Sequence, residues 1–168
     1  MKFRIIISIL ILAVFDFSVS AQESEVLSKL KKINLLKSTR DDIIRVFGEP
    51  EISTYPYFKS YSLKDGKVDI EYSTGLCGNK NKDGWNVPEF TVTRIFFDFK
   101  KPPNPKKYLN IHSKDFRKYP IKDVPGAFIY ENEKIGIDYS ITRKGKIESV
   151  TFYPAQKYDH LYCETNKK

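Results

Sequence analysis

The sequence contains few of the residues that usually carry nucleophilic or metal chemistry. Only two cysteines and two histidines occur in 168 residues, with one tryptophan and one methionine. A nucleophilic cysteine needs a base close to its sulfur and a third group that orients the base. The familiar zinc spacings of paired cysteines and paired histidines are missing. We therefore expect no cofactor, and the question of an enzyme stays open with a non-catalytic protein preferred.

Long apolar runs are also scarce. The longest is the mainly apolar stretch Ile5–Phe15, preceded by two basic residues and followed by a small-residue ending, Ser-Val-Ser-Ala, that stops at Ala21. A membrane-spanning helix needs about 20 apolar residues, whereas this pattern is typical of a signal peptide. We expect residues 1–21 to be a signal peptide and residues 22–168 to be exported to the periplasm or the extracellular space, with no transmembrane span. No cysteine stands at the expected cleavage point, so no lipoprotein anchor is predicted.

The two cysteines lie far apart, Cys77 in a loop rich in Gly, Asn, Lys and Asp, and Cys163 in the C-terminal segment. An exported chain meets an oxidising compartment, and two cysteines allow only one pair. We therefore predict a Cys77–Cys163 disulfide that fixes two segments without regular structure. Two alternatives are a nucleophile assisted by His160 and its neighbour Asp159, and a metal site formed by both cysteines and both histidines, His112 and His160.

The charge balance is basic, with 29 Lys and Arg against 21 Asp and Glu. Such a charge favours anionic partners such as polysaccharides, nucleic acids or membrane phosphates, and it also keeps a protein in solution. The segment KKPPNPKK at residues 100–107 concentrates lysines around three prolines, which exclude a central strand or helix. The candidate binding surface consists of this connector with a neighbouring tyrosine and of the tryptophan in another loop: Lys100, Lys101, Lys106, Lys107, Tyr108 and Trp85. The alternatives are a solvated loop and a tryptophan that covers the sheet or the disulfide.

Local patterns predict short helices followed by strands in each half of the chain. Apolar side chains at helical spacing favour helices within 23–36 and 38–48, and a capped helical turn is expected from Ser113. Alternating apolar residues predict strands at 57–63, 68–72, 91–99, 127–131, 135–141 and 147–153. We expect a single α+β domain over 22–168 in which short N-terminal helices pack on an antiparallel sheet. A helix with three strands could be repeated twice, over 24–99 and 108–153.

The second helix has the clearest start and stop signals. Ser38 is predicted as its N-cap with Asp41 three residues later, Gly48 as its C-terminal residue, and Pro50 prevents continuation. The polar cap, the helix and the Gly-x-Pro ending before a meander of strands resemble the helix motif of the SmpA/OmlA-type outer-membrane assembly lipoproteins and of the β-lactamase inhibitor proteins. The resemblance covers residues 38–50. It implies a helix that leads into strands and supplies no functional residue.

Three functions are compatible with these patterns. The preferred one is a secreted or periplasmic non-catalytic binding or structural module, whose partner would be an anionic polymer or an envelope protein. The second is an envelope enzyme that uses carboxylates from distant strands, because Asp69 with Glu71 and Glu131 with Glu133 alternate along two strands. The third is a polyanion-binding protein that acts through the basic loop 100–107.

Overall fold

A computed structural model describes residues 25–30, 32–51, 55–78, 81, 84–105 and 113–163. The predicted signal peptide, residues 1–21, lies outside the described residues, as do His112 and part of the predicted basic surface, Lys106, Lys107 and Tyr108. Within the part of the chain that is described, no helix is long and apolar enough to cross a membrane.

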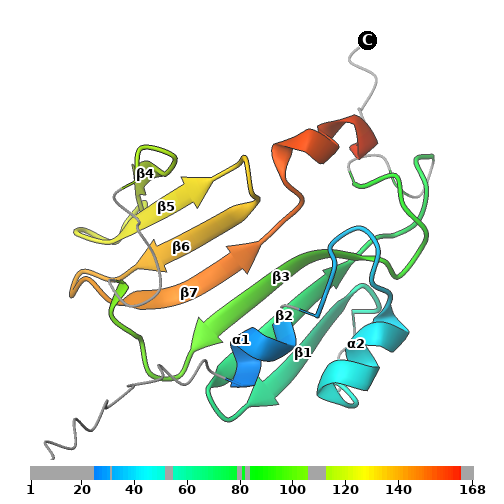
Figure 1. The fold of residues 1–168 in the computed structure, drawn as a ribbon, viewed down its shortest axis with the longest axis horizontal. Coiled ribbons are helices and arrows are strands. Elements are labelled where there is room, and N and C mark those ends of the chain that lie inside the picture. The colour runs from blue at the N-terminus through cyan, green and yellow to red at the C-terminus, as the bar shows by residue number, and fades with distance from the viewer. Residues whose placement is uncertain are drawn as a thin grey trace, which may run out of the picture.

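The described chain is built around one seven-stranded sheet. Its strands are β1 (Phe58–Leu63), β2 (Gly66–Tyr72), β3 (Val92–Phe99), β4 (Arg117–Pro120), β5 (Phe128–Asn132), β6 (Ile137–Ile141) and β7 (Ile147–Phe152). Their order across the sheet is β1-β2-β3-β7-β6-β5-β4, and all neighbours are antiparallel. Two meanders, one from each half of the chain, therefore join where β3 pairs with β7 (Figure 1).

The helices are short, and the predicted α+β class is wrong. Helix α1 (Glu25–Leu30) has six residues and α2 (Arg40–Phe47) has eight, and both lie over the half of the sheet formed by β1, β2 and β3 (Figure 1). A 3-10 helix, η2 (Gln156–Leu161), follows β7. The protein is mainly an antiparallel β structure, because the helical segments end after one or two turns while nearly every alternating segment forms a strand.

The segment after residue 112 shows where helix prediction failed. Ser113 begins a turn, in which its hydroxyl accepts a hydrogen bond from the N–H of Asp115 at 3.3 Å, and the strand β4 follows directly. All four residues of β4 are exposed, so the strand has no buried apolar side to reveal it in the sequence. The second half of the sheet thus has four strands, and the proposed repeat stays a prediction.

The start of α2 is displaced by one residue from the predicted cap. Thr39, in an extended conformation, is the N-cap, and its hydroxyl accepts a hydrogen bond from the N–H of Asp42 at 3.4 Å. The Asp42 carboxylate accepts one in return from the N–H of Thr39 at 2.7 Å. Ser38 cannot serve as the cap because it is buried and its hydroxyl accepts from the N–H of Asn34 at 2.9 Å. The capping box forms, with Thr39 and Asp42 in the roles expected for Ser38 and Asp41.

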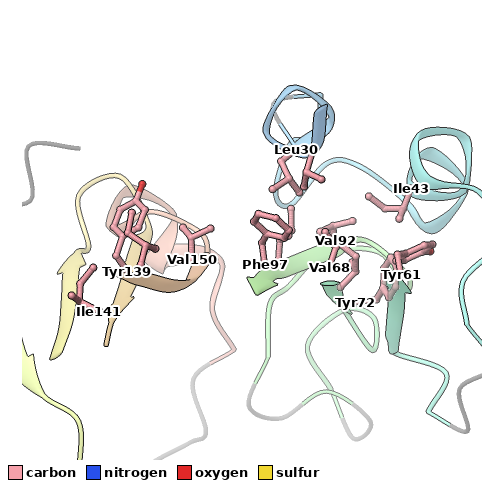
Figure 2. Close-up of a cluster of buried hydrophobic side chains, with 14 residues drawn as sticks. Leu30, Ile43, Tyr61, Val68, Tyr72, Val92, Phe97, Tyr139, Ile141 and Val150 are labelled. Atoms are coloured by element: carbon pink, nitrogen blue, oxygen red, sulfur yellow. The ribbon is translucent and has the colours of Figure 1, made fainter. Parts of the chain in front are cut away.

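The core lies on the helix side of the sheet. Alternate residues of β2, Val68, Ile70 and Tyr72, are buried there, as the period of two predicts. Figure 2 shows Leu30 of α1 and Ile43 of α2 pointing down onto this layer. Fully burying each such aliphatic side chain contributes about 1.5–3 kcal/mol. The core then continues across β7 and β6, where Val150 and Tyr139 among others are buried.

The opposite side of the sheet carries mostly polar side chains in register. Cross-strand partners form one row from β1 to β4: Ser60, Asp69, Phe96, Thr151, Asp138, Glu131 and Arg117. Side chains that alternate with buried ones point to the other face. The register therefore brings acidic and basic groups from both halves of the chain onto one polar face.

Candidate functional site

The predicted disulfide between Cys77 and Cys163 is confirmed. The bond joins residues 86 positions apart, with a Cα–Cα distance of 5.5 Å, and neither sulfur is a free thiol. A cysteine nucleophile or a zinc ligand must be a thiolate. The two alternative readings of Cys77 and Cys163, as a nucleophile and as a metal site, are therefore wrong. His160 is exposed on η2, where its Nδ1 lies 3.1 Å from the carbonyl oxygen of Lys157.

The disulfide joins the loop between β2 and β3 to the C-terminal segment that follows η2. The N–H of Cys163 donates to the carbonyl oxygen of Gly84 at 2.7 Å, and Trp85 forms an isolated β-bridge with Tyr162. The rings of Trp85 and Tyr162 meet edge to face, with centroids 5.1 Å apart. Trp85 is half-buried in this contact. It therefore packs against the disulfide-linked segment, and its role as a binding anchor stays a prediction.

The basic connector begins where β3 ends. Lys100 and Lys101 are exposed, and the N–H of Lys100 donates to the carbonyl oxygen of Asp65 in the β1–β2 turn at 2.9 Å. This bond fixes the first residues of the connector against the edge of the first meander. The two lysines are thus held at one end of the sheet with their side chains in solvent.

A second basic segment lies beside this connector. The β6–β7 turn carries Arg143, Lys144 and Lys146, and these side chains line a surface depression of about 530 Å³ together with Pro102 and Thr142. None of these lining residues is acidic. We call Lys100, Lys101, Arg143, Lys144 and Lys146 the basic end.

The β6–β7 turn has a defined backbone. The N–H of Gly145 donates to the carbonyl oxygen of Thr142 and the N–H of Thr142 to that of Lys146, both at 2.8 Å. Gly145 has a φ of 68°, which glycine adopts without steric cost. From the β4–β5 turn, Gly126 approaches so closely that a Cβ there would lie 2.9 Å from Cγ of Arg143. The backbone that carries the three basic side chains is therefore fixed by hydrogen bonds within the turn, and the β4–β5 turn lies against the side chain of Arg143.

Sequence reasoning named Lys100 and Lys101 but missed the other half of the basic end. The Arg-Lys-x-Lys composition of residues 143–146 was visible as a turn between two strands. Its position beside the connector was not visible, because it depends on strand pairing between residues far apart in the chain.

Acidic groups meet elsewhere, on the polar face of the second meander. Asp138 of β6 and Glu131 of β5 are directly opposite each other, and the Tyr153 hydroxyl donates to Glu131 at 3.5 Å. Burial raises the pKa of Asp138 to about 6, and the charges of Glu131 and Glu133 act in the same direction. A hydrogen bond from Tyr153 and the charge of Arg94 oppose this shift. The Oδ1 atom of Asp138 is buried without a hydrogen-bond partner among the described residues.

The acidic pairs named from the sequence have other partners. Asp69 is paired with Lys67 at 3.0 Å, and Glu71 with Arg94 at 3.5 Å. Glu133 faces Arg117 at 3.4 Å. Asp69 and Glu71 are therefore neutralised on the first meander and do not reach Glu131. The carboxylate that the pairing of β5 with β6 places beside Glu131, Asp138, was not predicted.

The fold and the site together define a disulfide-linked, mainly antiparallel β-sheet protein with a basic end. No family model matches the sequence, and no curated protein matches it. Among solved structures, a DUF4309 family protein (YjgB) from Bacillus subtilis aligns with 72% of this chain and 81% of its own, at 14% identity and a TM-score of 0.48. A similarity at this level carries no argument about function, and the resemblance to SmpA/OmlA-type and β-lactamase inhibitor proteins stays a prediction.

Proposed function

We propose that this protein is an exported, non-catalytic binding module that recognises an anionic polymer through its basic end. The observation that carries the proposal is that Arg143, Lys144 and Lys146 of the β6–β7 turn line, with Pro102 of the lysine-bearing connector, a depression whose described lining has no carboxylate. Because the backbone of both segments is hydrogen-bonded to the sheet, little backbone order has to be gained on binding.

The chemistry of the basic end suits a chain of repeated charges better than a single ion. One ion pair between an exposed lysine or arginine and a ligand contributes little to the binding free energy, about 0–1 kcal/mol. Several cations along a polyanion act together, because each neutralised phosphate or sulfate releases condensed counterions. The five side chains of the basic end come from two segments and present such a set.

Two observations support export. A disulfide persists in oxidising compartments and is rare in the cytosol, and Cys77–Cys163 is such a bond. The N-terminal residues also have the pattern of a signal peptide.

The proposal is tested with fluorescently labelled polyphosphate, whose binding is followed by anisotropy. The variant Arg143→Glu/Lys144→Glu/Lys146→Glu is expected to lose affinity by about 100-fold or more, since three charges are reversed at one place. The matched control, Lys64→Glu/Lys114→Glu/Lys118→Glu, changes the net charge equally at exposed positions outside both basic surfaces and is expected to lose far less. Equal losses in both variants would mean that only net charge matters, and would refute a defined site.

The envelope enzyme has one structural observation in its favour. Asp138 and Glu131 are neighbouring carboxylates with a raised pKa at Asp138, which is a feature shared by acid–base sites. This alternative predicts hydrolase turnover that is abolished by Asp138→Asn or Glu131→Gln. The binding module predicts no such turnover, and Asp138→Asn then changes only stability.

A further inference from the structure

A second groove lies at the other end of strand β6 from the basic end. It has a volume of about 400 Å³ and is formed by the α1–α2 connection on one side and by the β5–β6 turn with the segment after β7 on the other. Its described lining consists of three lysines, two tyrosines and small or aliphatic residues: Ile33, Asn34, Leu35, Lys37, Lys134, Ile135, Tyr153, Pro154, Ala155, Lys157 and Tyr158.

One wall of the groove is fixed by a close backbone approach. Gly136 has a φ of 69°, and a Cβ at this position would overlap the carbonyl oxygen of Tyr153. The carbonyl oxygen of Gly136 accepts from the N–H of Tyr153 at 3.0 Å, and that of Glu133 accepts from the N–H of Gln156 at 3.0 Å. These bonds hold the turn that carries Lys134 and Ile135 against the segment that carries Tyr153 and Lys157.

The other wall is held by the sheet. The N–H of Leu36 donates to the carbonyl oxygen of Val92 at 2.9 Å, and the N–H of Val92 donates to that of Ser38 at 2.8 Å. Leu36 has a φ of 61°, a conformation that costs free energy for a non-glycine residue and persists only where its surroundings impose it. The groove is therefore preformed rather than assembled by flexible loops.

The groove combines positive charge with apolar surface. Its lysines come from three separate segments, and none of its described lining residues is acidic. Lys134 has an ion pair with Asp115 at 3.5 Å outside the lining, and the ammonium of Lys157 lies 5.0 Å from the centre of the Tyr158 ring. The side chain of Ile135 is 63% exposed at the rim. A ligand here would meet cations and aliphatic groups side by side.

The positive surface extends beyond this groove. A neighbouring depression is lined by Lys32, Asn34, Lys37, Ser38, Asp42, Arg45 and Val46, so the two share Asn34 and Lys37. The one carboxylate in it, Asp42, is paired with Arg45 and with the N-cap of α2. Together the two depressions form a continuous path that fits an extended ligand better than a compact one.

We propose that this path, the lysine groove, binds an extended acidic peptide segment of a partner protein, with an apolar side chain seated against Leu35 and Ile135. The carboxylates of such a segment complement Lys37 and Lys157. A plain polyphosphate would use the cations alone and leave the aliphatic contacts empty. The proposal is independent of the basic end, which lies at the other end of β6.

The test uses a short fluorescently labelled peptide of glutamates around central leucines, with anisotropy as the readout. Lys37→Ala/Lys157→Ala is expected to weaken binding roughly tenfold, because two exposed ion pairs of up to about 1 kcal/mol each are lost. Ile135→Ser is expected to weaken it about fivefold through the lost apolar contact. Lys37, Ile135 and Lys157 all line the open groove and are exposed, so the fold is expected to be retained in these variants. Lys114→Ala/Lys118→Ala, with the same loss of charge at exposed positions outside both basic surfaces, is the control and is expected to leave peptide affinity within about twofold.

Replacing the central leucines of the peptide by serine should abolish the effect of Ile135→Ser. If peptide affinity ignores both this replacement and Ile135→Ser, the groove is a general anion site and the proposal is wrong. The proposal is also wrong if the control pair weakens peptide binding as much as the groove pair. Polyphosphate binding separates the two proposals. If the parent protein binds the peptide but not polyphosphate, only the proposed function is wrong; if it binds polyphosphate and Lys37→Ala/Lys157→Ala leaves peptide affinity unchanged, only the peptide proposal is wrong.

Discussion

The N–H of Ile147 donates a hydrogen bond to the carbonyl oxygen of Pro103 at 3.0 Å. This bond joins Ile147, the first residue of β7, to the proline-rich connector, which lies 44 residues earlier in the chain. Because Ile147 is fully buried, the bond is shielded from water and holds the connector against the β6–β7 turn. This contact places the connector beside the turn that carries Arg143, Lys144 and Lys146.

The disulfide is expected to be a major source of stability. Replacing both cysteines, as Cys77→Ser/Cys163→Ser, should lower the free energy of unfolding by roughly 4 kcal/mol, because the bond closes a loop of 86 residues in the unfolded chain. Denaturant unfolding of the variant and of the oxidised protein measures this difference. Unchanged stability, together with two titratable thiols in the purified protein, would contradict the pairing.

Asp138 is expected to make stability fall as the pH rises toward neutrality. Burial raises its pKa from the ordinary value of 3.8 to about 6, so between these pH values the folded state binds more protons than the unfolded state. The favourable contribution is complete below about pH 4 and is lost as the pH passes 6. After allowance for partial exposure to solvent, the change is about 1–2 kcal/mol.

The variant Asp138→Asn should remove this part of the pH dependence, because its side chain does not titrate. Unfolding free energies measured from pH 4 to 7 should then vary less than in the parent protein, with the difference largest at neutral pH. The control is Asp98→Asn, on the same polar face of β3 but exposed, which should retain the fall. If both variants give the parent profile, the buried environment assigned to Asp138 is incorrect.

Two glycines with similar backbone angles provide a matched test of the lysine-groove wall. Gly136→Ala should cost at least about 3 kcal/mol, since the new methyl group would overlap the Tyr153 carbonyl and φ is 69°. Gly145→Ala should cost only about 1 kcal/mol, because φ is 68° but nothing lies within 4 Å. Thermal or denaturant unfolding of the two variants measures the difference. Equal costs would show that the close approach at Gly136 is not required.

Much of the sheet could be predicted from the sequence because its signals are local. Alternation such as Val68, Ile70 and Tyr72 predicts a strand wherever one face is buried, and the Asp65-Gly66 turn predicts the hairpin that β1 and β2 form. The strand β4 could not be found in this way, since its residues are all exposed and its only support is pairing with β5.

The cap of α2 and the functional surface both differ from the sequence-based prediction, because each depends on contacts outside its own segment. Ser38 and Thr39 are both good N-caps in isolation, and the choice falls on Thr39 because the α1–α2 connection already uses the Ser38 hydroxyl. The pairing of the two cysteines followed from their number, whereas the approach of Pro102 to Arg143 depends on strand order. Contacts that depend on strand order are not encoded within a short window of sequence.

The most direct test of the account is the salt dependence of polyanion binding at the basic end. With a labelled single-stranded oligothymidylate as a polymer of known charge spacing, the logarithm of the binding constant should fall linearly with the logarithm of salt concentration. The slope is about −0.7 for each phosphate contact, so five cations give a slope near −3.5 and Lys144→Ala/Lys146→Ala should reduce its magnitude by about 1.4. A slope that is unchanged in this variant, or binding that is insensitive to salt, would contradict the assignment of the basic end as the binding site.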